Sequence, residues 1–224
     1  MASERNTGSS SLLLHRLLER QVARTPNDFA LEFYPDVRLT YHEVNSISNR
    51  LARYLKDNRS RDNEVVALWL EKSHIMVIAI LAVLKAGMAW VPLHLDAPSA
   101  RITQVLQSCD IEYILYSKSN QCTFGEPSLY LRLEDVLDSP QLLSYATNNL
   151  DDDERTTDDL CHILFTSGSS GVPKGVMIEH RAIVHCITAL VEALKIQPGT
   201  RTLQFAAPVF DVFGLDLFMT LAAG

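Results

Sequence analysis

The sequence has few cysteines, and none of them are closely spaced. The four are Cys109, Cys122, Cys161 and Cys186 in 224 residues. A structural zinc site or a secreted disulfide framework needs closely spaced cysteines, so we expect neither, assign no metal-ligating residue and expect a reducing, cytoplasmic location. The polar stretch from Met1 to Ser11 also lacks the apolar segment of a signal peptide.

Clusters of basic residues are also missing. The formal net charge is −7, and Lys and Arg are scattered along the chain. This excludes the basic surface that binds nucleic acid and leaves no basic face for anionic lipid. The longest apolar stretch, 75–93, contains Lys85, Gly87 and Pro92. We therefore interpret it as a buried helix followed by a buried strand, and we expect no membrane association.

What the chain does contain is the alternation of strands and helices that is typical of a globular α/β protein. The predicted elements are a strand at 64–70, a helix at 73–86, a strand at 88–93, a helix at 98–109, and strands at 112–116 and 128–131. Strand–helix–strand units of this kind have parallel strands and right-handed crossovers. The predicted fold class is α/β, a mostly parallel sheet with helices on both faces.

Elements of other kinds are predicted on either side of this alternation. Residues 1–10 are expected to be a disordered tail, and an acidic stretch at 138–157 is expected to be a solvated loop. The remaining predictions are a helix at 12–23, a hairpin of strands at 30–34 and 37–41, a helix opened by a capping box at Thr40, a helix at 180–195, a strand at 202–206 and an apolar helix from Phe210 with a core stripe of Phe210, Phe213, Leu217, Phe218 and Leu221.

A loop of small residues separates two strand-like apolar runs. It begins with six residues that are only Thr, Ser or Gly, and it ends at Lys174 and Gly175; the six are Thr166, Ser167, Gly168, Ser169, Ser170 and Gly171. Such a loop exposes backbone N–H groups to a polyphosphate, and Lys174 adds a mobile positive charge. A flexible linker is the alternative interpretation, but linkers seldom lie between two strands. No Gly-Lys pair is followed by Ser or Thr, so this is not a Walker A loop.

The run from Thr166 to Gly175 resembles the phosphate loop of the adenylate-forming (AMP-binding) enzymes, and the continuation to Arg181 resembles their nonribosomal peptide synthetase branch. A second run, Leu84 to Leu93, is similar to another signature of these adenylation domains. This signature indicates the fold and not the chemistry. The resemblance implies that the loop holds the β- and γ-phosphates of ATP, with Mg²⁺ on the triphosphate, while a carboxylate attacks the α-phosphorus. The ATP-binding residues implied are Thr166, Ser167, Gly168, Ser169, Ser170, Gly171, Lys174 and Gly175. The ligands of Mg²⁺ cannot be identified in the sequence.

The same resemblance gives Asp211 a role in substrate binding. Peptide-synthetase adenylation domains carry Phe-Asp-x-Ser at this point, and their Asp pairs with the α-ammonium of the amino acid. This chain has Phe213 in place of the Ser. Val212 and Leu215 are implied to line the same corner of the pocket, which favours an apolar substrate side chain. From the residues alone, Asp211 could equally be a helix cap.

The resemblance covers less than half of an adenylation domain. We interpret residues 11–224 as a partial AMP-binding domain, truncated before the adenine, ribose and C-terminal lysine elements, so no catalytic residue is assigned. The implied function is that of a ligase of secondary-metabolite biosynthesis, which activates an amino acid with ATP, is inactive by itself and serves a carrier domain in trans. Whether the chain alone is an enzyme stays open. An acyl-CoA synthetase-type fragment and a non-enzymatic remnant that binds a partner are the alternatives.

Overall fold

The computed structural model describes residues 12–58, 65–117, 129–151, 155–166 and 173–224. Its main sheet has six strands in the order β6-β5-β3-β4-β7-β8. The bounds of these strands are β3 Val65–Trp69, β4 Ala89–Pro92, β5 Tyr113–Tyr116, β6 Leu129–Arg132, β7 Leu160–Thr166 and β8 Lys174–Glu179. All neighbours are parallel except β7 and β8, which form an antiparallel pair at one edge.

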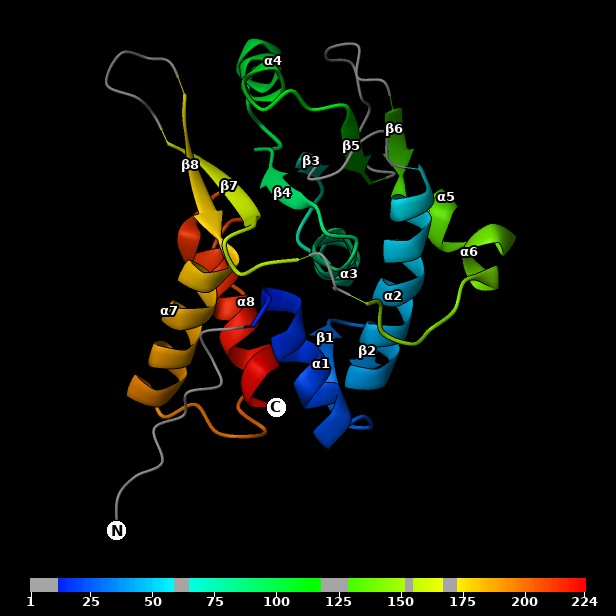
Figure 1. Ribbon diagram of the computed structural model, residues 1–224, viewed down its shortest axis with the longest axis vertical. Helices are drawn as coiled ribbons and strands as arrows, with labels where there is room; N and C mark the ends of the chain where they lie inside the picture. The colour runs from blue at the N-terminus through cyan, green and yellow to red at the C-terminus, as the bar shows by residue number, and fades with distance from the viewer. Residues whose placement is uncertain (1–11, 59–64, 118–128, 152–154, 167–172) are drawn as a thin grey trace.

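Helices cover both faces of this sheet, as the sequence predicts (Figure 1). On one face the core is completed by α4, through Ile102, Val105 and Leu106. The larger core on the other face joins five long helices. Their bounds are α1 Leu14–Arg24, α2 Tyr41–Asn58, α3 His74–Lys85, α7 His180–Ala193 and α8 Asp211–Ala223, and α4 is Ser99–Ser108.

The small antiparallel hairpin of β1 (Phe29–Phe33) and β2 (Val37–Thr40) leads into α2, where the predicted capping box forms. The Glu43 carboxylate accepts the Thr40 backbone N–H at 2.8 Å, and the Glu43 N–H donates to the Thr40 hydroxyl at 3.2 Å. These two bonds satisfy donors that a helix start would otherwise leave unpaired. Ser73 caps α3 in a similar way by accepting the Met76 N–H.

Two predictions from the sequence were wrong. The strand expected at 202–206 is absent, because this segment pairs with no strand among the described residues. The stretch 138–157 is not only solvated loop, because it contains the short helix α6 (Pro140–Ser144), preceded by α5 (Leu133–Leu137). Leu142 and Leu150 from this stretch are buried in the main core. A few apolar residues that follow neither a helical nor a strand periodicity can still pack into the core and hold a loop in place.

A buried polar network joins α1, α2 and α3. Lys85 lies at the end of α3, and its ammonium donates to Glu19 at 2.9 Å, to Asn45 at 2.5 Å and to Asn49 at 2.6 Å. Both asparagine side chains also donate to the side-chain Oδ1 of Asn149. A buried ammonium is costly unless its donors are paired, and here three partners meet it. The signature that contains Lys85 therefore contributes to the fold.

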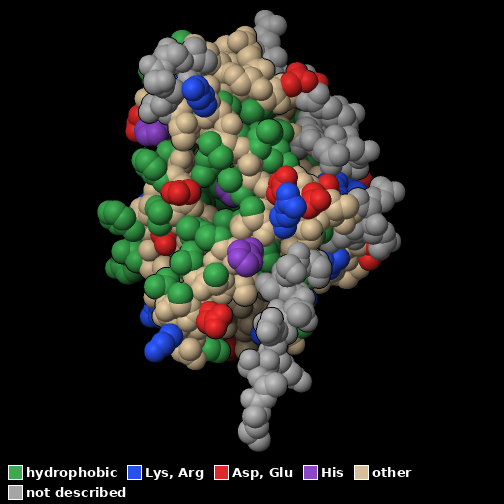
Figure 2. Space-filling model, turned by 60° about the vertical axis from the view of Figure 1, so that its left-hand side comes forward, with side chains coloured by type: hydrophobic (Ala, Val, Ile, Leu, Met, Phe, Trp, Pro, Cys, Tyr) green, Lys and Arg blue, Asp and Glu red, His purple; other side chains and the backbone are tan. Residues whose placement is uncertain are grey.

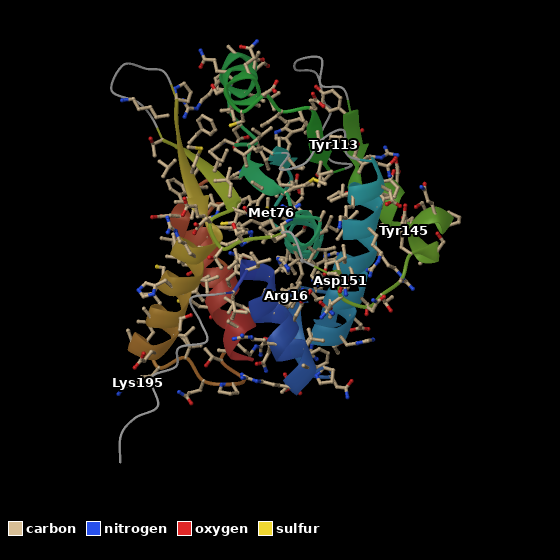
Figure 3. All side chains as sticks on the ribbon, in the orientation of Figure 1. Arg16, Met76, Tyr113, Tyr145, Asp151 and Lys195 are labelled. Atoms are coloured by element: carbon tan, nitrogen blue, oxygen red, sulfur yellow. The ribbon has the colours of Figure 1, made fainter. Side chains whose placement is uncertain are left out.

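Arg16 extends this network to the surface. Its guanidinium donates to Glu19 at 2.6 Å and to the Leu150 carbonyl at 3.2 Å (Figure 3, where Arg16 and Asp151 are labelled).

Among the described residues, no helix combines the length and the apolar character that crossing a bilayer would need. The stretch 75–93 is divided between α3 and β4, as predicted.

Candidate functional site

The predicted phosphate loop is held between β7 and β8. In the register of this pair, Thr166 faces Lys174 and Phe165 faces Gly175, so the loop leaves the sheet at the carboxyl end of β7. The Thr166 hydroxyl donates to the Lys174 carbonyl at 3.4 Å. Both side chains are exposed at this base. An ammonium on a strand end, beside the loop, is available to an anion bound there.

Five of the predicted ATP-binding residues lie outside the described residues, and they are Ser167, Gly168, Ser169, Ser170 and Gly171. The three that the structure describes are Thr166, Lys174 and Gly175. At Gly175 a Cβ atom would lie 3.1 Å from the Ile163 side chain and 3.2 Å from the Phe165 ring. The absent side chain thus leaves room for β7 side chains, a packing role beside the predicted one.

Asp211 is the first residue of α8, and Phe210 occupies the cap position without a side-chain cap. The Asp211 carboxylate is exposed and accepts the Val212 backbone N–H at 2.8 Å. A carboxylate in the first turn is stabilised by the positive end of the helix. Asp211, Val212 and Leu215 are exposed or half-buried, and their spacing on α8 places them on neighbouring parts of one face.

The expected core stripe of α8 holds except at its first member. Phe210 is 62% exposed, whereas Phe213, Leu217, Phe218 and Leu221 are buried. Phe210 precedes the helix, so the helical period does not govern its direction. Phe213 points into the core, where its ring meets Trp90 edge-on with centroids 6.5 Å apart. The residue that replaces the expected Ser is therefore a packing residue.

A stack of buried rings links the loop strand to α8, and sequence analysis did not identify it. His162 on β7 is stacked on Trp90 of β4 with ring centroids 5.2 Å apart, and Trp90 in turn meets Phe213. Burial lowers the pKa of His162 to about 4, so its imidazole is neutral at pH 7. The register pair of Trp90 with His162 gives the stack, a contact that only the sheet order reveals.

The neighbouring Cys161 is not a reactive thiol. Its sulfur lies 3.3 Å from His162 Nδ1 and 3.1 Å from the Ile178 carbonyl oxygen. Burial raises the pKa of the Cys161 thiol well above its usual range. A buried thiol of this kind stays protonated and inert.

Hydrophobic side chains gather around a hollow on the side that carries β7, β8 and α7 (Figure 2). Several large apolar residues of the neighbouring segments are exposed, and they are Val176, Met177, Leu203, Phe205, Phe210 and Val212. The part of α8 from Phe213 to Leu221 is not among these exposed residues, because α1 and α7 cover it.

Comparison with known proteins gives the family. The AMP-binding enzyme profile matches residues 18–224. The chain is 36% identical to "Tyrocidine synthase 1" of Brevibacillus parabrevis over 211 residues, which are 94% of this chain and 19% of that protein. It is 32% identical to "Gramicidin S synthase 2" of Brevibacillus brevis over 211 residues, which are 94% of this chain and 5% of that protein. The chain therefore spans a small part of each of these relatives.

Solved structures agree with the fold. The structure matches "Nonribosomal peptide synthetases (NRPS), FmoA3 (S1046A)-AMPPNP bound form" with a TM-score of 0.85 at 24% identity, over 99% of this chain and 23% of that one. It matches the "NpsA N-terminal subdomain in complex with 3-hydroxybenzoyl-AMSN" of Klebsiella oxytoca with a TM-score of 0.78 at 26% identity, over 95% of this chain and 52% of that one.

Proposed function

This chain belongs to the AMP-binding enzyme family, and we propose that it is part of an adenylation domain that activates an amino acid for peptide synthesis. Its similarity to tyrocidine synthase 1 and gramicidin S synthase 2 supports this assignment. In the proposed reaction the amino acid carboxylate attacks the α-phosphorus of ATP. A bond forms to the carboxylate oxygen, the bond to pyrophosphate breaks, and the products are an aminoacyl adenylate and pyrophosphate.

The observation that carries the proposal is the position of Thr166 and Lys174 where the β7–β8 loop joins its two strands. Thr166 and Lys174 face each other there with exposed side chains, at the two ends of a segment made of small residues. We propose that the backbone N–H groups of Ser167 to Gly171 approach the β- and γ-phosphates, and that Lys174 supplies the opposing charge. Family membership favours this over a linker, because the AMP-binding profile runs through the loop.

The substrate ammonium is proposed to bind at Asp211. The Asp211 carboxylate is exposed in the described chain. Its exposure leaves it accessible to an ammonium ion, with Val212 and Leu215 beside it for an apolar side chain. The Asp211 carboxylate would then hold the α-ammonium, which shares its carbon with the reacting carboxylate, and so help to position that carboxylate.

Mg²⁺ is proposed to accompany the triphosphate. The described residues contain no group of three or more His, Cys, Asp or Glu side chains that could hold a metal ion, so no step is assigned to it.

A carrier domain in trans is the proposed acceptor of the aminoacyl group, and a cytoplasmic location is part of the proposal. By itself the 224-residue chain is proposed to be inactive, because the implied lysine that meets the α-phosphate lies in the C-terminal element.

Amino-acid-dependent ATP–pyrophosphate exchange tests the proposal. The chain should be extended to a complete domain with the missing half of a relative, and Asp211→Asn should then be compared with the unchanged domain. Exchange with the amino acid should fall by about 1.5–3 kcal/mol in transition-state terms, the scale of a hydrogen bond to a charged group.

The matched control is the same acid without its amine, which should lose much less. Equal losses for both acids would show that Asp211 only stabilises the start of α8, and the acyl-CoA synthetase-type alternative would then be preferred. No exchange with any acid in the unchanged, folded domain would favour the non-enzymatic remnant.

A further inference from the structure

The start of α8, which carries Asp211, is not held by a side-chain cap of its own. Phe210 occupies the cap position without a side-chain bond, and the Asp211 carboxylate accepts the N–H of its neighbour Val212. Helix ends fray, and a side-chain cap is the usual device that holds the first turn. The position of Asp211 therefore depends on contacts from other parts of the chain.

Gln204 supplies one such contact. Its side-chain Nε2 donates to the Phe213 backbone carbonyl at 3.0 Å, in a bond that is partly buried. Phe213 lies two residues after Asp211, in the first turn of α8. Within the segment that this bond closes, the Phe210 N–H donates to the Ala207 carbonyl at 3.0 Å. The Gln204 side chain thus ties the segment before α8 to the first turn of the helix, with Asp211 between the two tied points.

The segment that carries Gln204 is itself attached to the main sheet. Lys72 lies between β3 and α3, and its ammonium donates to the Phe205 carbonyl at 2.9 Å and to the Gln204 carbonyl at 3.4 Å. Hydrogen bonds from a charged donor are stronger than those between neutral groups. A chain of hydrogen bonds therefore runs from the end of β3, through Gln204, to the turn that carries Asp211.

The side chain of Phe213 holds the same turn through a separate contact. Its ring meets Trp90 edge-on with centroids 6.5 Å apart, and Trp90 is stacked on His162 of β7. The same strand ends at Thr166, where the predicted phosphate loop begins. With its carbonyl bound by Gln204 and its ring packed on Trp90, Phe213 sets the first turn of α8 relative to the strand that carries the loop.

From these contacts we propose that Gln204 is a positioning residue for the substrate ammonium. Its role is indirect, because it holds the first turn of α8 so that the Asp211 carboxylate keeps the place in which it meets the ammonium. A carboxylate that is already ordered binds more tightly than a mobile one, since less conformational freedom is lost on binding. This inference rests on the proposed amino acid site at Asp211.

Kinetics of the completed domain used for pyrophosphate exchange test the role of the bond. Gln204→Met keeps a side chain of similar length but has no N–H to donate. The KM for the amino acid should rise about threefold to tenfold, the scale of one neutral hydrogen bond, while the KM for ATP and the KM for the same acid without its amine change less than about twofold. Equal increases for all three would show a general structural role and would overturn the proposal.

Gln197→Met is the matched control. Gln197 is exposed after the end of α7, and its Nε2 also donates to a backbone carbonyl, that of Lys195, at 3.3 Å. The variant removes the same kind of bond at a place that does not contact the start of α8, so the KM for the amino acid should not change. An increase as large as that of Gln204→Met would show that the bond to Phe213 is not the cause.

Amide hydrogen exchange of the 224-residue chain gives a readout that needs no activity. Gln204→Met should speed the exchange of residues 215–218, whose N–H groups bond to the first turn of α8, about threefold or more, because local opening becomes easier. The exchange of α1, which packs on α8, should stay the same. Unchanged exchange at 215–218, or the same acceleration over the whole chain, would contradict a local positioning role.

A double-mutant cycle with Asp211 separates this inference from the proposed function. If Gln204 acts through Asp211, adding Gln204→Met to the Asp211→Asn domain should raise the KM for the amino acid no further. Fully additive effects would overturn the inference. Normal exchange in Asp211→Asn alone would refute the ammonium site and this inference with it. A loss in Asp211→Asn without any change in Gln204→Met would refute this inference and leave the proposed function standing.

Discussion

His162, on the strand that leads into the predicted phosphate loop, gives folding a pH dependence. Its pKa is lowered to about 4 by burial, whereas an unfolded His has a pKa of about 6.5. Between these values the unfolded chain binds a proton that the folded chain does not, so stability falls as the pH drops from 6.5 to 4. The loss should approach roughly 3 kcal/mol, with no further contribution from this residue below pH 4.

Urea unfolding followed by circular dichroism between pH 7 and pH 4 measures this effect. His162→Phe keeps a ring on Trp90 but removes the titration, so its stability should decline less over the same range. If the variant loses as much stability as the unchanged chain, the proton uptake belongs to other groups.

Lys174 is the residue of the loop that a substitution tests most simply, because its side chain is exposed and its removal should not disturb the sheet. In a completed domain, Lys174→Ala should weaken the use of ATP by about 1–3 kcal/mol, the scale of hydrogen bonds to charged groups. The ATP dependence of pyrophosphate exchange measures this. Lys56→Ala, at an exposed lysine of α2, should have no effect. An unchanged ATP dependence in Lys174→Ala would contradict the loop assignment.

At this scale the sequence predicts the identity of chemical groups better than their surroundings. A connection between two strands was correctly expected here, because a run of small residues between two apolar runs predicts one, although Thr166 and Lys174 were assigned to the loop and lie on the strand ends. The exposure of Asp211 and the burial of His162 were not predictable. Both depend on which elements pack above them, and no local pattern in the sequence carries that information.

Among the helices, the ammonium of Lys85 holds α3 against α1 and α2. Lys85→Met should destabilise the chain by about 3–5 kcal/mol, because it leaves the Glu19 carboxylate buried with fewer partners. Adding Glu19→Gln should restore part of the loss, since the unpaired charge is then removed. Urea unfolding of both variants tests this.

Lys72→Met is the matched control for this prediction. Lys72 is exposed and its ammonium donates to the Phe205 carbonyl at 2.9 Å, so its loss should cost less than about 1 kcal/mol. An equal cost for the two lysines would show that the network around Lys85 contributes no more than a surface contact.

The helices and parallel strands were predictable because each has a local cause, such as the capping box at Thr40 or the apolar run of α3. The strand expected at 202–206 was not, because a strand exists only with a partner. Side chains hold the segment instead: Lys72 donates to two of its carbonyls, and Gln204 donates to the Phe213 carbonyl at 3.0 Å.

For the whole molecule, the missing strand pairing at 202–206 leaves an exposed apolar strip, formed by Leu203 and Phe205. Leu203 is 81% exposed and Phe205 is 80% exposed, while Gln204 between them turns inward. The strip lies on a segment without a partner strand among the described residues, and Phe210 and Val212 add further exposed apolar area. Exposed apolar side chains gathered in this way promote association between chains.

We therefore expect the 224-residue chain to self-associate through this strip, and the double substitution Leu203→Ser and Phe205→Ser to reduce that association. Sedimentation velocity at several protein concentrations measures the change, and binding of an apolar fluorescent dye should fall in parallel. Leu143→Ser removes a 61% exposed apolar residue of α6, which packs on α2 and α5, and should leave the association unchanged. All three substituted positions are exposed, so neither variant should lose the fold. A chain that stays monomeric at high concentration, or that associates equally in both variants, would show that this strip is not the surface that brings two copies together.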